Sequence, residues 1–408
     1  MAPLTPEQEN DAIAFLLRLG RSLHALGHSS HRVEETLGDA ADRLGLHGQF
    51  FTTPTSIFAA FGEVEQQRTY LSRVEPGELH LERLGRVQSL TRDVLEGRLG
   101  PRDGVLALDQ LEREPAHWGL LITTLAFGVA GAAAARFLGG GMNEVVTAAA
   151  MAMLTGWLAG SGLLPAGTQR VFEPLAAFLV SGLVSALATR VPLSTYLATL
   201  GGLIVLLPGL TLSSAIAELN SQHLVSGTAR LTGALVRFVA LGFGVALGAR
   251  VAGLAFGAPS TVVATPLPAW TEGVALLLAP LAFTVLMRAR PVDAVPILGV
   301  CCVAFLGGRA GASALGPELG VFAGAFAAAL ASNLLARWRD LPPLVTLSPA
   351  LLLLVPGSVG FRSLALLLER EVLDGIQAAF RMVLMFAALV AGTQVAGVAL
   401  PAPRLRGR

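Results

Sequence analysis

The sequence predicts a mainly α-helical, polytopic membrane fold: about ten transmembrane helices in two five-helix inverted repeats, preceded by a small cytoplasmic α+β domain. Three observations lead to this prediction. The 408-residue chain is 53% hydrophobic and only 14% charged. Its apolar character begins abruptly at Trp118, and two later apolar runs are each interrupted by a Pro-Gly pair. A chain of this composition is too apolar for an ordinary soluble enzyme.

Charge and cysteine content argue against several other classes of protein. The formal net charge of +1 gives no basis for a nucleic-acid partner. The two cysteines, Cys301 and Cys302, are adjacent in an apolar segment, so they provide neither a disulfide framework nor a metal-ligand spacing. No nucleophile elbow, P-loop or dinucleotide-binding glycine run is present. We therefore expect no cofactor, no metal and no covalent chemistry.

The first 117 residues are predicted to form a soluble α+β domain that stays in the cytoplasm. Apolar residues recur at helical spacing in its first and last parts, whereas β-forming residues dominate the middle. The expected elements are helices at 6–26, 30–44, 78–96 and 101–112 and strands at 49–61 and 66–74. Pro54 indicates two short strands or an edge position there. Charges interrupt residues 1–20, so we expect no signal peptide.

Three histidines of this domain, His24, His28 and His31, are spaced so that one continuous helix would carry them on one face. Such a face can hold a metal ion or support acid–base chemistry. However, Gly27 and the Ser29-Ser30 pair indicate that the helix breaks between them. We therefore favour a solvated or intradomain polar surface over a metal or hydrolytic site.

The rest of the chain contains ten apolar segments, most of them long enough to span a bilayer as helices. They cover residues 118–138, 144–164, 172–189, 193–219, 230–252, 268–287, 293–310, 318–336, 341–368 and 373–400. The fourth and ninth have too few residues before their Pro-Gly pair to cross unbroken. We assign five segments to a first membrane repeat at 118–258 and five to a second at 266–402.

The two Pro-Gly pairs, Pro208-Gly209 and Pro356-Gly357, are expected to break their helices. Proline lacks a backbone donor and clashes with the preceding turn. Backbone groups freed inside a bilayer are tolerated only where protein or a wet cavity satisfies them. The paired breaks therefore predict a binding site, as in membrane proteins with discontinuous helices.

A fixed offset of 148 residues relates the two halves of the membrane region. It superimposes the two Pro-Gly pairs. It also superimposes Trp157 on Phe305, Gly160 on Gly308, Phe178 on Phe326, Gly227 on Gly375 and Phe238 on Phe386. Because each half has five spans, the second must enter from the opposite side, which gives an inverted repeat. The placement of arginines on the connections favours an amino-terminal domain and a carboxyl terminus that both lie in the cytoplasm.

Polar residues beside the two breaks form the candidate substrate site. A zwitterionic substrate needs donors for its carboxylate, which helix-start amides or Arg362 can supply, and an acceptor for its ammonium, which a half-helix carbonyl end or Glu218 can supply. Nearby hydroxyls can read a hydroxylated side chain. The candidates are Pro208, Gly209, Thr211, Ser213, Ser214, Glu218, Pro356, Gly357, Ser358, Arg362 and Ser363. The alternative is an interfacial position for the charged residues, with hydroxyls bonded to their own helices.

Other ionisable residues at membrane depth are functional candidates because they are costly there. Glu173 and Glu218 are the candidate proton carriers, with an interfacial position as the alternative for Glu173. Arg237 and Arg381 lie nearer the interiors of their segments, and Arg237 has no basic counterpart at the offset of 148. Either arginine can pair with an acidic group across the interface between the repeats.

Four stretches of the chain together resemble one known family. LHALGHSSHRVEETL at 23–37, TPTSIFAAFG at 53–62 and VEPGELHLERL at 74–84 are similar to the amino-terminal domain of the threonine/serine exporter family. LVPGSVGFRSL at 354–364 and the ten spans are similar to its membrane half, in which two five-span regions occur fused. His80 departs from that pattern, where we expect an amide or acidic residue.

This resemblance implies a secondary active exporter of threonine and serine, driven by the proton gradient across a bacterial cytoplasmic (inner) membrane. The expected partners are a small amino-acid substrate, protons and the lipid bilayer, and the sequence is compatible with a homo-oligomer. Two alternatives remain open at this point. One is a dicarboxylate exporter of the same architecture, since Arg362 suits either substrate. The other is a membrane-tethered hydrolase or sensor that uses the histidine-bearing domain.

Overall fold

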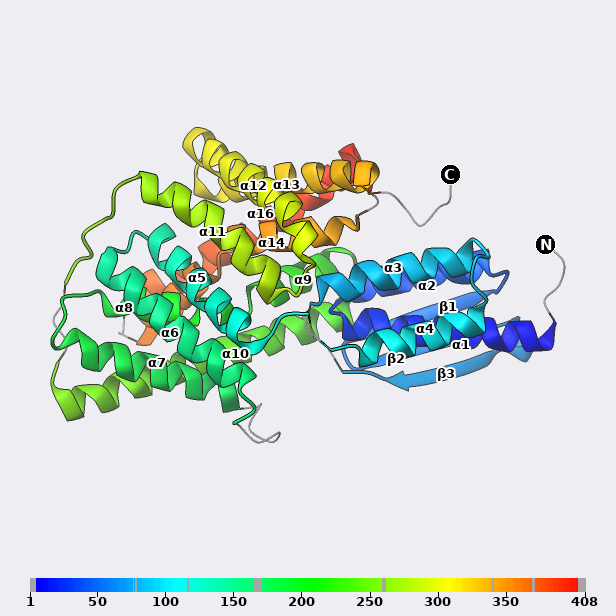
Figure 1. The fold of residues 1–408 in the computed structure, drawn as a ribbon, viewed down its shortest axis with the longest axis horizontal. Coiled ribbons are helices and arrows are strands. Elements are labelled where there is room, and N and C mark those ends of the chain that lie inside the picture. The colour runs from blue at the N-terminus through cyan, green and yellow to red at the C-terminus, as the bar shows by residue number, and fades with distance from the viewer. Residues whose placement is uncertain are drawn as a thin grey trace.

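The computed structural model describes residues 5–402 except 76, 78, 116, 164–170, 259–261, 340 and 369–370. Figure 1 shows a helical bundle and, where the chain begins, a smaller domain of helices and strands. This amino-terminal domain contains α1 (Pro6–Ala25), α2 (Ser30–Arg43), β1 (Gly48–Thr53), β2 (Ser56–Phe61), β3 (Arg68–Arg73), α3 (Leu81–Leu95) and α4 (Pro101–Arg113).

The amino-terminal domain is built on an antiparallel sheet of strand order β1-β2-β3, with helices covering one of its faces. Helix α1 begins at a capping box, in which Thr5 and Gln8 exchange hydrogen bonds, and the chain turns at Gly27, whose φ is +79°. The β1–β2 hairpin turns directly after Thr53, which pairs with Ser56. The prediction of two short strands around Pro54 is therefore confirmed.

The bundle has a helix, or a pair of helices with a break, in each of the ten predicted apolar segments. Its elements are α5 (Leu120–Phe137), α6 (Met142–Gly160), α7 (Phe172–Ala188), α8 (Thr195–Leu203), η3 (Ile204–Leu206), α9 (Gly209–Asn220), α10 (Leu224–Phe256), α11 (Trp270–Leu286), α12 (Ala294–Leu315), α13 (Pro317–Arg339), α14 (Pro343–Leu354), α15 (Gly357–Leu368) and α16 (Val372–Ala399).

Six of the described helices are long and apolar enough to cross a membrane, or seven if the bent pair Thr195–Leu206 and Gly209–Asn220 is one span. Helices α7 and α11 are apolar but shorter. The protein is thus a membrane protein with several apolar helices, while the count of ten spans stays a prediction.

Glycines allow the closest helix contacts in the bundle. Helix α7 packs along α10, where a methyl group on Gly248 would lie 2.2 Å from the carbonyl oxygen of Phe178. Helix α13 packs along α16 in the same way, because a methyl group on Gly392 would lie 2.5 Å from the carbonyl oxygen of Phe322. Small residues let membrane helices approach until their backbones touch. Both contacts therefore depend on glycine.

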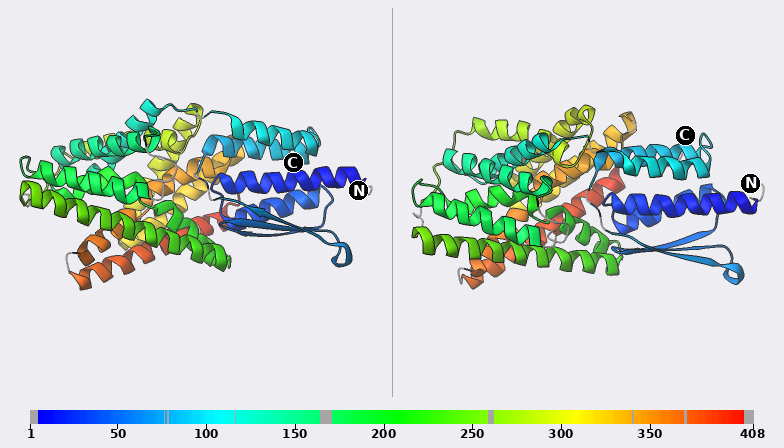
Figure 2. Two further views of the ribbon diagram at one scale, coloured as in Figure 1. Left: turned by 90° about the horizontal axis from the view of Figure 1, so that it is seen from below. Right: turned by 60° about the horizontal axis from the view of Figure 1, so that its bottom comes forward.

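The amino-terminal domain is docked firmly on the bundle. The amides of Leu81 and Glu82, at the start of α3, donate to the carbonyl oxygens of Met287 and Arg288 after α11, at 3.0 and 3.1 Å. The Trp118 indole donates to the carbonyl oxygen of Ala289 at 2.9 Å. Figure 2 shows the long helix α10 reaching from this domain to the opposite end of the molecule. The two parts share one hydrophobic core.

Replacement of Gly248 by alanine should destabilise the protein. The added methyl group would displace α7, and overpacking of this kind costs about 1–3 kcal/mol. Gly253→Ala on the same helix is the matched control, because no atom lies within 4 Å of the place that its methyl group would take, and alanine favours a helix by up to about 1 kcal/mol. Thermal unfolding in detergent should show a lower Tm for Gly248→Ala alone. Equal Tm values for both variants would contradict the packing described.

Candidate functional site

Both expected helix breaks are present, and they share one local conformation. Leu207 (φ −65°, ψ 130°) and Val355 (φ −61°, ψ 126°) are extended, and each immediately precedes a proline. The proline ring disfavours the α conformation in the residue before it, which explains why both helices stop there. The helices around Pro208 are bent by 58°, whereas Pro343–Leu367 still qualifies as a single span. The breaks are therefore alike locally but differ in bend.

The two breaks touch each other. A methyl group on Gly209 would lie 2.2 Å from Cγ1 of Val355, and one on Gly357 would lie 3.6 Å from Cβ of Leu207. The prolines and glycines of both breaks are buried. Helices α9 and α15 begin here, so both direct their amino-terminal ends, with unpaired amides and positive dipole ends, toward this contact.

The predicted hydroxyls fall into two groups. Ser213 Oγ donates to the carbonyl oxygen of Gly209 on its own helix at 3.1 Å, and Ser363 Oγ donates to that of Gly375 on α16 at 2.7 Å. Both hydroxyls are therefore engaged by backbone carbonyl oxygens of helices. Thr211, Ser214 and Ser358 are partly exposed, and none of the three has a hydrogen-bond partner among the described residues. These three hydroxyls are the ones free to meet a ligand.

Arg362 is exposed and lies about 8 Å along α15 from Gly357, at a rise of about 1.5 Å per residue. It interacts electrostatically with Tyr196, whose ring packs 6.3 Å from that of Phe361. No ion pair holds the guanidinium among the residues that the structure describes. Its role in carboxylate binding stays a prediction.

Glu218 lies at the far end of α9, about 14 Å from Gly209 along the helix axis. It is fully buried and accepts a hydrogen bond from the backbone amide of Ser30 at 2.8 Å. Its Oε2 lies 3.0 Å from Nε of Arg230, whose guanidinium also donates to the carbonyl oxygen of His28. The carboxylate thus fastens α9 and α10 to the start of α2 in the amino-terminal domain.

Further polar contacts extend this interface. Ser226 Oγ accepts from Ser30 Oγ at 2.8 Å and donates to the carbonyl oxygen of Thr52 at 3.1 Å. Nε2 of His223 lies 3.0 Å from Oε2 of Glu34, and the other oxygen of Glu34 accepts from the amide of Thr52 at 2.6 Å. Sequence reasoning did not pair the residues that meet across this interface, because the partners lie more than 170 positions apart along the chain.

Three histidines of the amino-terminal domain, His24, His28 and His31, lie at or near this interface. Nε2 of His24 faces the carbonyl oxygen of Thr53 at 3.1 Å. Burial lowers the pKa of His28 and of His31 to about 4, with Arg32 nearby as the second cause for both. No group of three His, Cys, Asp or Glu side chains suited to a metal ion occurs among the residues described. His24 thus contacts its own domain, whereas the ring of His31 lies 5.8 Å from that of His223 across the interface.

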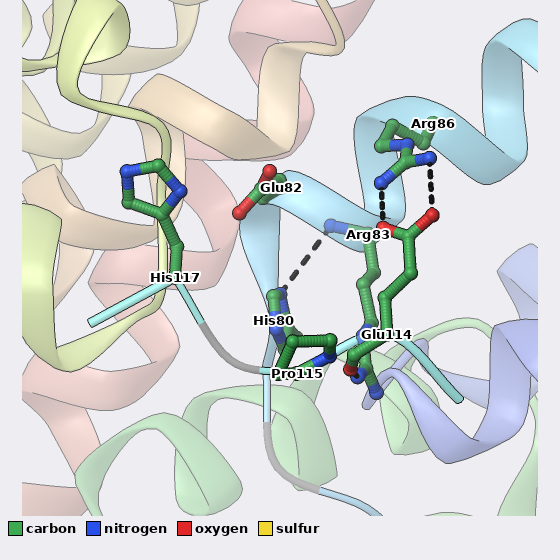
Figure 3. A pocket seen from close by; sticks show the side chains of 7 residues that line it. All are labelled: His80, Glu82, Arg83, Arg86, Glu114, Pro115 and His117. Carbon is green, nitrogen blue, oxygen red and sulfur yellow. Dashed lines mark hydrogen bonds and ion pairs between the residues drawn. The ribbon is translucent and has the colours of Figure 1, made fainter. Parts of the chain in front are cut away.

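A separate cavity of about 260 Å³ lies beside the start of α3 (Figure 3). It is lined by His80, Glu82, Arg83, Arg86, Glu114, Pro115 and His117. Arg86 pairs with the carboxylate of Glu114, and Nδ1 of His80 accepts from the amide of Arg83 at 3.3 Å. Burial lowers the pKa of His80 to about 4. Arg86 and Glu114 thus already pair with each other within the lining.

The remaining predicted membrane charges form pairs within each half of the bundle. Glu173 on α7 lies 3.6 Å from Arg237 on α10. Arg381 on α16 lies 3.0 Å from Glu318 on α13. The interpretation that these arginines pair across the two halves is therefore wrong, because the partner is the neighbouring helix of the same half. Asn220 of α9 does bridge the halves, donating to Gln394 of α16 at 2.6 Å.

Comparison with known proteins identifies the family. A family model described as "Putative threonine/serine exporter" matches residues 14–252, and one described as "Threonine/Serine exporter, ThrE" matches residues 272–399. The chain belongs to the threonine/serine exporter family. In this exporter-family chain the two matched parts are fused, and together they include the amino-terminal domain and both breaks.

Several yeast proteins are among the curated relatives of this exporter-family protein. An uncharacterized protein of Schizosaccharomyces pombe is 28% identical over 59% of the chain and 32% of the relative. Pheromone-regulated membrane protein 10 is 27% identical in Candida glabrata, over 59% of the chain and 31% of the relative. In Saccharomyces cerevisiae it is 26% identical, over 64% and 36%. The chain spans about a third of the length of these relatives. No solved structure matches the chain.

Replacement of Glu218 by glutamine should loosen the amino-terminal domain. The neutral amide keeps the shape but removes the charge that Arg230 and the Ser30 amide share, and breaking a buried pair is strongly destabilising. Hydrogen exchange should then accelerate at the first turn of α2. Glu35→Gln is the control, because Glu35 lies on α2 and its side chain is half exposed. Unchanged exchange at Ser30 in Glu218→Gln would argue against the interdomain role.

The stability of the protein should fall as the pH drops from 6.5 toward 4. In that window the unfolded chain protonates His28 and His31, whereas the folded chain, in which burial lowers the pKa of both to about 4, does not. The unfolded state therefore binds more protons and gains stability. Tm should be lower at pH 5 than at pH 7.5, and His28→Gln should reduce the difference. His47→Gln, at an exposed position, should leave it unchanged.

Proposed function

We propose that this protein is a secondary active exporter of the small amino acids threonine and serine, coupled to protons. The single observation that carries the proposal is the contact between the two Pro-Gly breaks, which brings two helix amino termini to one place inside an apolar bundle. Membership of the threonine/serine exporter family supports the substrate class. No step of this function needs covalent chemistry.

The proposal includes ten spans in two inverted five-helix repeats, α5–α10 and α11–α16. Reciprocal packing supports it: α9 packs on α16, and α15 packs on α10, while α5 packs on α11. Leu207 and Val355 adopt the same extended conformation at equivalent places. Corresponding helices of two repeats would meet in this crosswise manner around a two-fold axis.

Docking of the amino-terminal domain supports the proposed topology. The domain touches the connection before α10 through Glu34, the connection after α11 through Leu81, and Pro342 before α14 through Gly85. With ten spans, these three connections would all lie on the side of the amino terminus. We propose that this is the cytoplasmic side of a bacterial inner membrane. The carboxyl-terminal arginines Arg404, Arg406 and Arg408 lie outside the described residues.

Substrate recognition is proposed at the contact between the breaks. Unpaired amides in the first turns of α9 and α15 would bind the carboxylate, with Arg362 as an alternative donor. Because Glu218 already has two partners, the ammonium would meet the carbonyl ends of η3 and α14 instead. Thr211, Ser214 and Ser358 would bind the side-chain hydroxyl of threonine or serine.

Transport would require the two breaks to separate and rejoin. Gly209 and Val355 are packed without room for a substrate between them. The proposal therefore treats this arrangement as a closed state. Movement of α9 and α15 apart would open the site, and the half-helix ends could do so from either side of the membrane. Alternating access of this kind is typical of inverted-repeat transporters.

Counterflow in proteoliposomes tests the function. Vesicles loaded with unlabelled threonine should take up labelled threonine, and serine should compete. Succinate inside the vesicles should drive no threonine uptake. Exchange of succinate alone would instead support the dicarboxylate alternative and contradict our proposal.

Replacement of Gly209 by alanine should impair export. The methyl group would collide with Val355, and a cost of about 1.4 kcal/mol would reduce the closed population about tenfold. Gly357→Ala is the control, because its methyl group would sit at ordinary contact distance. Val355→Ala should restore export to Gly209→Ala by removing the colliding methyl groups. A Gly209→Ala variant that exports at the normal rate would show that the breaks need not meet.

A further inference from the structure

Two ion pairs in the bundle share one construction. Oε1 of Glu173 on α7 lies 3.6 Å from Nε of Arg237 on α10, and Oε1 of Glu318 on α13 lies 3.0 Å from Nε of Arg381 on α16. Each glutamate is the second residue of its helix. The pairs therefore join corresponding helices of the two proposed repeats.

The packing around these pairs shows that they are equivalent. Arg237 precedes Gly248, and Arg381 precedes Gly392, by the same interval of about three helical turns. Each glycine packs on a phenylalanine carbonyl of the helix that carries the glutamate. The arginines, the glycines and the phenylalanines correspond here at an offset of 144 residues, and the glutamates at an offset of 145. Phe178 thus corresponds to Phe322, not to Phe326. Arg237 thus does have a basic counterpart, which the offset of 148 concealed.

Within α10 the offset between the two halves changes from 148 at Gly227 to 144 at Arg237. Gly227 and Gly375 make the same contact with Leu219 and Leu367, at the offset of 148. The interval from Gly227 to Arg237 therefore contains about one turn more than the corresponding interval of α16. This added turn moves Arg237 by four residues relative to Arg381 along the sequence, while each arginine still pairs with a glutamate.

Two other carboxylates of the bundle, Glu144 and Glu218, are unsuited to exchange protons. Glu144, 3% exposed, accepts from the amides of Gly141 and Ser194. Glu218, 0% exposed, is held by Ser30 and Arg230. In contrast, the side chains of Glu173 and Glu318 are 26% and 34% exposed. A group that takes up and releases protons has to be reachable.

A third pair, Glu272 on α11 with Arg309 on α12, is equally open but has no counterpart. The corresponding helices α5 and α6 carry only Arg136 and Glu144 as charged residues, and Glu144 binds backbone amides. Duplication in both halves therefore distinguishes the α7–α10 and α13–α16 pairs from an ordinary ion pair.

We propose that Glu173–Arg237 and Glu318–Arg381 are the two proton-exchange sites of the export cycle, one in each repeat. This inference rests on the proposed function. As the helices shift and the arginine leaves, the carboxylate loses its partner in an apolar environment and takes one proton from water. When the pair forms again, the carboxylic acid returns that proton to water. The arginine stays charged throughout, so one proton moves per pair.

The arginine of each pair is the main charge that its glutamate meets. The other charged groups on the two repeats' paired helices and on elements packed against them are Glu144, Glu218, Arg230, Arg250, Arg309, Arg337, Arg339, Arg362 and Asp374. None of these makes an ion pair with Glu173 or Glu318 among the described residues. Opening or closing of the arginine contact would therefore control each protonation.

The test separates exchange from coupling in proteoliposomes that contain the full chain. Glu173→Gln and Glu318→Gln imitate the protonated carboxyl group permanently. Each variant should keep threonine counterflow within twofold of the natural protein. Each should lose at least tenfold in threonine accumulation driven by an imposed pH gradient, and in threonine-dependent proton flux followed with a pH-sensitive dye. Glu272→Gln, the matched control, should keep both.

Other outcomes would overturn the inference. Normal gradient-driven accumulation in both variants would remove the two glutamates from coupling. Loss of counterflow together with accumulation would show that the pairs only hold the bundle together. Absence of proton flux in the natural protein would contradict coupling itself, whereas absence of its threonine counterflow would contradict the proposed function rather than this inference.

Discussion

Proline has no amide proton, and its ring forces the residue before it out of the helical conformation. In this protein that constraint acts twice, at Leu207 and at Val355, and it ends two apolar helices at corresponding places. Glycine follows each proline, so the side chains of Val355 and Leu207 can each pack directly against the backbone of the other break. The close approach of the breaks, the convergence of two helix amino termini and the tight packing around them all depend on this pair of dipeptides.

A buried charge sets the second constraint. An unpaired carboxylate would be very costly inside a protein, and Glu218 avoids that cost only through an amide of the amino-terminal domain and the guanidinium of Arg230. The domain is therefore part of the structure that stabilises α9, the helix that begins at the first break. A single helix, α9, thus carries both the interface residue Glu218 and the break at Gly209.

Features set by local chemistry could be predicted from the sequence. The strands around Pro54, the turn at Gly27, the apolar helices and both breaks follow from proline, glycine and hydrophobic periodicity. Contacts between distant residues could not. Glu218 faces Ser30, which lies 188 positions away, and Ser363 is engaged by Gly375 rather than free. The sequence comparison did not match Arg237 with Arg381, because it used one fixed offset and α10 contains about one turn more than α16 in this interval.

That added turn also distinguishes the two ends of the molecule. It lies in the stretch of α10 that begins beside Ser226 and includes Arg230, both of which hold the amino-terminal domain. The corresponding stretch of α16 is shorter, and its neighbour α15 carries no equivalent of Glu218 in sequence. The two halves are similarly built, but among the described residues only the first offers these contacts to the amino-terminal domain. The domain therefore docks beside α10 and not beside the matching part of α16.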